Sequence, residues 1–184
     1  MVLESRDSYK HEIAAYELDK LLGFGIAPPC VERTIEGETG SLCFWLENTM
    51  SEWSRSTETN LDPPNVDDWN SQVYTIRLFL SLIDDPDSHN TSLILIDANW
   101  KLYRVDFSVA FTNNRKLNLK TVPNWFCRTA LESLQNLSSE EVEATLDAWL
   151  EEKQIRALIA RKDALLELAG KRIAEEGASA VLIP

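Results

Sequence analysis

Hydrophobic positions in the first third of the chain follow first a helical and then a strand spacing. Residues 8–22 carry apolar side chains three and four positions apart, which predicts a helix capped by Ser8 or Asp7 and ended by Gly23. Residues 30–47 alternate on either side of a Glu-Gly turn, which predicts a β-hairpin. Residues 48–66 are polar and contain two consecutive prolines, so we expect a surface insertion there.

The rest of the chain is predicted to be mainly helical. A helix at 67–83 leads into a polar loop, and two short strands at 93–96 and 102–105 then fold the chain back on itself. Three further helices are expected at residues 123–135, 138–150 and 151–176. The apolar tail 178–184 can pack back on the body. This order of elements predicts an α+β fold with most of its helical mass towards the C-terminus.

The net charge of the chain argues against anionic binding partners. The net charge is −12 and no basic run interrupts it, so the chain repels nucleic acid and anionic lipid surfaces. We therefore expect no nucleic-acid partner. A nucleotide such as ATP is also an anion, so a nucleotide site here needs a metal ion to offset the charge.

Cysteine and targeting patterns favour a cytoplasmic protein. Cys30, Cys43 and Cys127 are few, odd in number and far apart, so we expect free thiols in a reducing compartment. Two histidines are too few for a His-rich metal site. We find no signal-peptide pattern and no apolar run long enough to span a membrane.

The residues with the clearest chemical implication lie between positions 80 and 111. An apolar helix leads into the acidic loop that carries Asp87, and the predicted hairpin returns the chain to Asp106 beside that loop. Phosphoryl transfer needs such a pair, because one carboxylate orients the nucleophile and another holds Mg²⁺ on the nucleotide phosphates.

This stretch resembles the atypical kinase superfamily that includes phosphatidylinositol 3- and 4-kinases, bacterial HipA-type kinases and secretory-pathway kinases. The resemblance rests on Asp87-Ser-His-Asn-Thr-Ser92 followed by an apolar strand, and on Val105-Asp-Phe-Ser-Val-Ala-Phe111. It implies that Asp87 is the catalytic base and that Asp106 binds the metal. The family's metal-binding Asn falls on Ser92, a weaker ligand, and Asn90 is a nearby substitute.

The same resemblance extends to the first 47 residues. Residues 8–22 are similar to the upper-lobe helix of bacterial members, which places Glu12 where that helix offers a glutamate to an ATP-binding lysine. Trp45 and Glu47 fall at the hinge between the lobes. We therefore expect Glu12, Trp45 and Glu47 to contact the nucleotide. Lys10 lies on the same helix as Glu12 and does not match the strand lysine of the family.

The resemblance implies a protein-kinase-like fold in two parts. Residues 1–47 would form a remnant upper-lobe helix and hairpin, and residues 48–184 the helical catalytic-loop lobe. The expected cofactors are ATP and Mg²⁺, weakly bound, with an unknown protein, lipid or small-molecule acceptor. An upstream polypeptide that supplies the missing upper lobe is a further expected partner.

Two other interpretations stay open. One is a degenerate kinase, or pseudokinase, that serves as a binding or regulatory module without catalysis. The other is an unrelated helical interaction domain, in which Asp87 and Asp106 are ordinary turn and cap residues.

Overall fold

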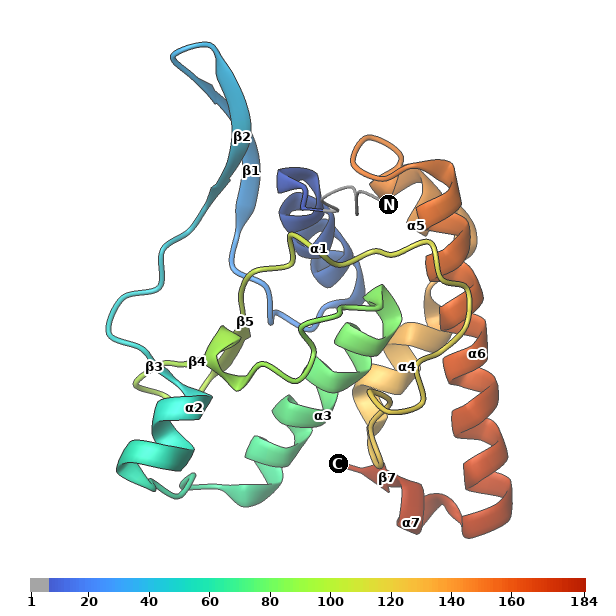
Figure 1. The fold of residues 1–184 in the computed structure, drawn as a ribbon. Coiled ribbons are helices and arrows are strands. Elements are labelled where there is room, and N and C mark those ends of the chain that lie inside the picture. Colours follow the sequence, from blue (N-terminus) through green and yellow to red (C-terminus); the bar gives the residue numbers. More distant parts are fainter. Residues whose placement is uncertain (1–6) are drawn as a thin grey trace, which may run out of the picture.

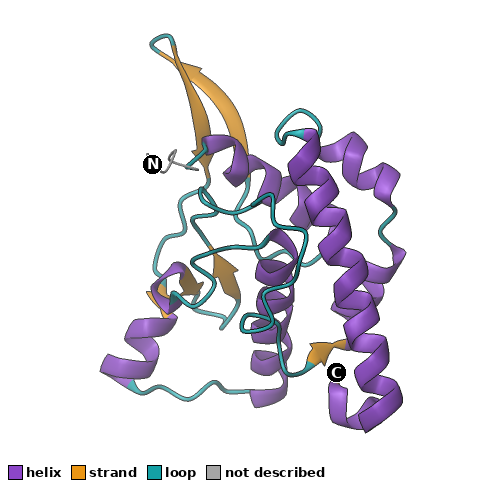
Figure 2. Cartoon of the chain, turned by 45° about the vertical axis from the view of Figure 1, so that its right-hand side comes forward, coloured by secondary structure: helices purple, strands orange, loops and turns teal. Residues whose placement is uncertain are grey.

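The structure, a computed structural model, describes residues 7–184 and confirms the predicted mixture of helices and small sheets. A hairpin projects from one end of the body, and a long helix runs along one side (Figure 1). Helices make up most of the body, and its sheets are short (Figure 2). No helix in the described part is long and apolar enough to cross a membrane.

Helix α1 (Tyr9–Leu22) begins and ends where the sequence predicts. The Ser8 hydroxyl accepts a hydrogen bond from the Lys10 N–H at 3.3 Å, which caps the first turn. Gly23 ends the helix in the left-handed conformation, at φ 71°, where glycine avoids the steric cost of a side chain. The helix buries Ile13, Ala14 and Leu18 in the core, which fixes the side from which α1 presents Glu12.

The hairpin consists of β1 (Cys30–Ile35) and β2 (Glu38–Cys43). Glu36 and Gly37 both have positive φ, the conformation that a two-residue hairpin turn needs. The antiparallel register puts Cys30 directly opposite Cys43, and the two form a disulfide. The prediction of free thiols is therefore wrong for this pair, because the tight turn joins cysteines that are 13 positions apart. Only Cys127 is a free thiol, so the cysteines no longer argue for a reducing compartment.

The segment predicted as a polar insertion contributes to the body instead. Strand β3 (Met50–Ser51) pairs antiparallel with β4 (Ile94–Ile96), and β4 pairs with β5 (Leu102–Arg104). Two short helical turns, α2 (Glu52–Ser54) and η1 (Arg55–Thr59), follow β3. Two residues are too few to show an alternating pattern, which explains why β3 was missed.

Helix α3 (Val66–Ile83) forms the centre of the core. The Asn65 side chain caps it by accepting from the N–H groups of Asp67 and Asp68. Its last turns are buried almost completely, as the apolar periodicity predicts. The loop after α3 enters η2 (Thr91–Leu93) and then the β4–β5 hairpin, which confirms the predicted hairpin within residues 93–105.

The C-terminal third is helical, as expected. Its helices are α4 (Arg128–Asn136), α5 (Ser139–Leu146), α6 (Glu152–Glu176) and α7 (Ala178–Val181). The predicted capping box between Ser138 and Glu141 is present at the start of α5. Strand β6 (Phe126–Cys127) replaces the first turn predicted for α4, because it pairs in parallel with the tail strand β7 (Leu182–Ile183).

Arg161 on α6 ties the end of α3 to the chain that follows β5. Its buried guanidinium donates to the Leu82 carbonyl at 2.7 Å and also to the Thr112 and Asn114 carbonyls. Burial lowers the pKa of Arg161 to about 10, against a smaller opposing effect of Asp84. These bonds fix the two ends of the segment on which the candidate site is built.

Candidate active site

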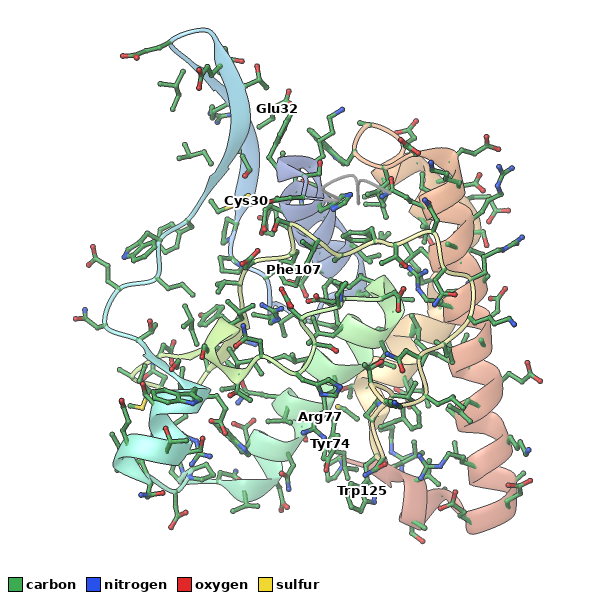
Figure 3. All side chains as sticks on the ribbon, in the orientation of Figure 1. Cys30, Glu32, Tyr74, Arg77, Phe107 and Trp125 are labelled. Atoms are coloured by element: carbon green, nitrogen blue, oxygen red, sulfur yellow. A yellow bond between two sulfur atoms is a disulfide. The ribbon has the colours of Figure 1, made fainter. Side chains whose placement is uncertain are left out.

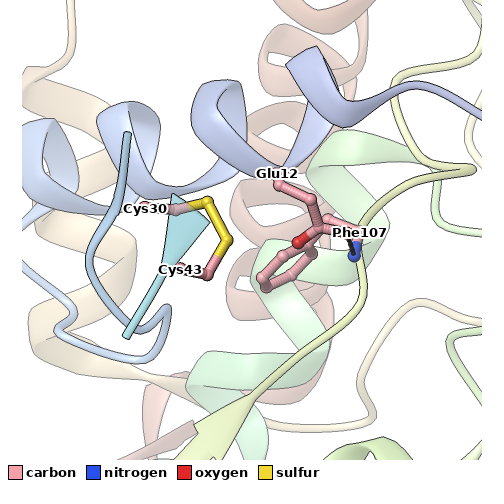
Figure 4. Close-up of a disulfide and its surroundings, with 4 residues drawn as sticks. All are labelled: Glu12, Cys30, Cys43 and Phe107. Atoms are coloured by element: carbon pink, nitrogen blue, oxygen red, sulfur yellow. Dashed lines mark hydrogen bonds between the residues drawn. A yellow bond between two sulfur atoms is a disulfide. The ribbon is translucent and has the colours of Figure 1, made fainter. Parts of the chain in front are cut away.

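Glu12 links α1 to the segment after β5. Its carboxylate accepts a hydrogen bond from the Phe107 N–H at 2.7 Å (Figure 4). Burial raises the pKa of Glu12 to about 7; the Phe107 hydrogen bond opposes this rise and the negative charge of Asp106 adds to it. The Glu12 side chain therefore fixes the position of Phe107, the residue next to Asp106, and is not free in solvent.

The segment that carries Asp106 has an unusual backbone. Asp106 has φ 63°, a left-handed conformation that is uncommon for a residue with a side chain. Its carboxylate is exposed and accepts from the Ser108 hydroxyl at 3.0 Å. Phe107 is buried and packs edge-on against Phe79 of α3, with ring centroids 5.9 Å apart. The anchored phenylalanine therefore turns the preceding carboxylate outwards.

His11 anchors the same segment from α1. Its Nδ1 lies 2.8 Å from the Ser108 carbonyl, and its Nε2 lies 3.1 Å from the Gln154 amide nitrogen. Gln154 also donates to the Phe111 carbonyl at 2.9 Å. Burial lowers the pKa of His11, against the opposing effect of the Ser108 carbonyl. This histidine thus serves the architecture and not a metal.

A buried ion pair interacts with Asp87, the predicted catalytic base, and with Asp106, the predicted metal ligand. Arg104 donates to Asp85 at 2.8 Å, and neither side chain is exposed to solvent. Burial lowers the pKa of Arg104, although Asp85, Asp106 and Asp87 all oppose this effect. Burial likewise raises the pKa of Asp85, and the charge of Arg104 opposes it. The positive charge of the Arg104 guanidinium therefore acts on three aspartates: its buried partner Asp85, and Asp87 and Asp106.

Sequence reasoning did not assign Asp85 or Arg104 to the site. Asp85 stands beside a proline, where an aspartate is a common turn residue. Arg104 lies in an ordinary alternating strand, two positions before Asp106. The charge of Arg104 could have identified this pair. An arginine at an inward-facing strand position needs a buried acid as its partner.

The loop between α3 and β4 places Asp87 at the surface. Its N–H donates to the Asp85 carboxylate at 2.8 Å, and its carbonyl accepts from the Asn90 N–H at 2.9 Å. The Asn90 side-chain oxygen accepts from the Ser92 N–H at 3.1 Å and so caps η2. Asn90 and Ser92 thus share one turn, and Asn90 already uses its oxygen within the loop.

A cavity of about 430 Å³ opens where α1, the hairpin base and the Asp106 segment meet; we call it the front cavity. Glu12, Trp45 and Asp106 line it, so three of the predicted site residues come together there. Its remaining walls are mostly apolar and include the Cys30–Cys43 disulfide, drawn beside Glu12 in Figure 4. Trp45 keeps 82% of its surface exposed, so its ring is available to a ligand.

The other predicted site residues do not line this cavity. Asp87, Asn90 and Ser92 belong to the neighbouring loop, and Glu47 lies two positions beyond Trp45. The only charged groups among the lining residues are the two carboxylates of Glu12 and Asp106. The front cavity therefore has an acidic character that suits a cation.

The donor set fits magnesium in chemical type. Mg²⁺ takes oxygen ligands and is typically held by one or two carboxylates together with substrate phosphates. Asp106 supplies one exposed carboxylate, and Glu12 a second, half-buried one. Within residues 7–184, no three His, Cys, Asp or Glu side chains group closely enough to form a complete protein-only metal site.

Comparison with known structures supports a kinase-like fold for the chain. No family model and no curated protein sequence matches the chain. A solved structure described as hydra Fam20 with sugar is similar to it, with a TM-score of 0.67 and 17% sequence identity. The match covers 100% of this chain and 77% of the hydra chain. At this identity the likeness supports a kinase-like fold alone, and it does not select the phosphatidylinositol or HipA type.

Proposed function

We propose that this chain is a kinase-like phosphotransferase domain that binds ATP with Mg²⁺ in the front cavity. The observation that carries the proposal is the convergence of Glu12, Trp45 and Asp106 on one cavity of about 430 Å³. These residues lie on α1, on the linker after β2 and on the segment after β5, and the sequence motifs named all three. Ligand pockets of this size with apolar walls and few polar groups are typical small-molecule sites.

The residues have distinct roles in this proposal. The exposed ring of Trp45 provides a flat apolar face for the adenine base, next to Glu47 at the hinge. Asp106 offers a carboxylate to the metal in the front cavity. Asn90 and Ser92, proposed as weak secondary ligands, lie on the neighbouring loop and do not line this cavity. When bound, Mg²⁺·ATP supplies the electrophilic phosphoryl group and neutralises the acidic cavity.

Asp87 accepts or orients the proton of the acceptor hydroxyl. It is exposed, and its backbone is held by the buried Asp85, so the carboxylate has a fixed base and free access to an acceptor. The positive charge of the buried Arg104 attracts the carboxylates of Asp87 and Asp106, as well as that of its ion-pair partner Asp85. Glu12 positions Phe107 and therefore the neighbouring Asp106.

A second candidate is a binding module without catalysis. The specific observation is that no lysine or arginine is among the residues that line the front cavity in the described part of the chain. Kinases use a lysine to position the phosphates. Without one, nucleotide affinity rests on the metal and the apolar walls, so weak binding without turnover is the outcome that this candidate expects.

Titration calorimetry with ATP, in the presence and absence of Mg²⁺, tests the proposal. We expect weak binding that requires the metal and is lost in Trp45→Ala. Asp87→Asn should keep this binding but abolish phosphate transfer, measured as autophosphorylation or ATP hydrolysis. Asp163→Asn removes the same charge from an exposed position on α6 and serves as the matched control.

Each result separates the candidates. Binding with turnover supports the phosphotransferase, and binding without turnover in the unmodified protein supports the binding module. Absence of any Mg²⁺-dependent ATP binding at millimolar concentrations rules out both. Tight binding of ATP without metal contradicts the acidic character of the cavity.

A further inference from the structure

A second cavity, of about 440 Å³, lies behind the strand that borders the first; we call it the rear cavity. Ile94 of β4 lines the rear cavity and its neighbour Leu95 lines the front one, because successive strand side chains point to opposite faces. Its other walls come from α3, the Asp87 loop and residues 120–124. None of the predicted nucleotide-binding residues lines it.

The rear cavity is positively charged in an acidic protein. Arg77 and Lys120 both line it, and neither has a carboxylate within 4.0 Å among residues 7–184. The only carboxylate in its wall is Glu52, which Arg55 neutralises through two contacts of 2.6 and 2.9 Å. Two cations without acidic partners in one cavity wall give this part of a chain of net charge −12 a local positive charge.

Aromatic groups adjoin these cations. Arg77 stacks over the Tyr74 ring, with its guanidinium carbon 5.6 Å from the ring centroid. Tyr74 in turn packs edge-on against Trp125, with ring centroids 5.6 Å apart, and Figure 3 shows the three labelled side chains close together beside α3. Such stacking keeps the planar guanidinium oriented, so less conformational freedom is lost when it binds an anion.

The rear cavity also contains an unused hydrogen-bonding group. The Ser88 hydroxyl oxygen is buried and makes no hydrogen bond within the described part of the chain. Ser88 lines the rear cavity and directly follows Asp87. Buried hydroxyls nearly always have a partner, so an unpaired one in a cavity wall points to a ligand that supplies it.

We propose that the rear cavity binds a small aromatic or apolar molecule that carries a phosphate monoester. A phosphate monoester has up to two negative charges and three terminal oxygens, which match two cations and one hydroxyl better than a carboxylate does. Arg77 and Lys120 hold the phosphate, and the body of the ligand lies against Tyr74 and Val73. Ser88 supplies the third contact by rotating its buried hydroxyl into the cavity. The proposal does not depend on nucleotide binding in the front cavity.

Titration calorimetry with phenyl phosphate as the probe tests this assignment, with benzyl alcohol and benzoate as companions of similar size. We expect phenyl phosphate to bind, benzoate to bind more weakly and benzyl alcohol not to bind. Arg77→Gln and Lys120→Gln should each weaken the association by about tenfold, the value of one charge-assisted contact. Lys171→Gln removes an exposed charge on α6 outside the cavity and should change the affinity by less than about twofold.

Three results would overturn the proposal. The first is the absence of phenyl phosphate binding at millimolar concentrations. The second is equal affinity of Arg77→Gln and the control Lys171→Gln for phenyl phosphate. The third is loss of binding in Trp45→Ala, which would place the probe in the front cavity. Tighter binding of benzoate than of phenyl phosphate would overturn the choice of a phosphate. Arg77 and Lys120 are both exposed, so we expect their substitution to leave the fold intact, and unchanged melting curves verify this.

Discussion

Glu12 offers the most direct test of the candidate site, through the pH dependence of stability. Folding raises its pKa from 4.5 to about 7, so the folded state binds a proton that the unfolded chain has already lost between these values. Stability from this group is complete below pH 4.5 and is lost as the pH rises through 7. At pH 8 the folded protein therefore carries the full cost of an ionised, half-buried carboxylate.

The substitution Glu12→Gln removes this cost while keeping an oxygen that accepts the Phe107 N–H. A difference of about 2.5 pH units corresponds to about 3 kcal/mol as an upper limit. Glu12 is partly exposed, and solvent screening reduces the figure to about 1–2 kcal/mol. We expect the variant to be more stable than the parent by that amount at pH 8 and equally stable near pH 4.5.

Urea denaturation at pH 4.5, 6 and 8 measures this difference, and several degrees in Tm should accompany it. Glu167→Gln is the matched control, because Glu167 is exposed on α6 and makes no side-chain hydrogen bond or ion pair within residues 7–184. A Glu12→Gln protein that is less stable than the parent at pH 8, or a difference that does not grow with pH, refutes the argument.

Three further predictions concern the elements around the site. Arg104→Met should lower the free energy of unfolding by about 3–5 kcal/mol in urea, because it leaves Asp85 buried without a counter-charge; a loss below about 1 kcal/mol contradicts this. Reduction with dithiothreitol should lower the free energy of unfolding by about 3 kcal/mol, because the disulfide closes a short loop. A Cys30→Ser/Cys43→Ser variant should not respond to the reductant. Asp106→Asn should change stability by less than about 0.5 kcal/mol without metal, because the amide oxygen still accepts from Ser108, but should abolish any thermal shift with Mg²⁺·ATP. A metal-independent destabilisation by this last substitution would instead make Asp106 a structural cap.

Much of the fold follows from local sequence signals. The cap at Ser8, the glycine stop at Gly23 and the capping box of α5 all act within a few residues, so they can be recognised without tertiary information. The β4–β5 hairpin is similar, because its turn lies between two apolar runs. The elements that were missed depend on distant partners: β3 exists only because β4 accepts it, and β6 because the tail strand returns to it.

The candidate site could be predicted only in part, because some of its features depend on residues that are distant in sequence. Motif order identified Glu12, Trp45 and Asp106, and the structure brings them to one cavity. The roles assigned to these three residues, and to Asp87, Asn90, Ser92 and Glu47, remain predictions. Arg104 and the disulfide were not foreseen, because each depends on how strands align and not on spacing along the chain.

The position of β4 between the two cavities has a consequence for mutational scanning. Ile94 and Leu95 are adjacent in sequence but belong to different cavities. In a saturation library selected separately for each ligand, tolerance along this strand should alternate residue by residue, and the alternation should reverse between the two selections. These two adjacent residues would then separate the two cavities and evolve under different constraints.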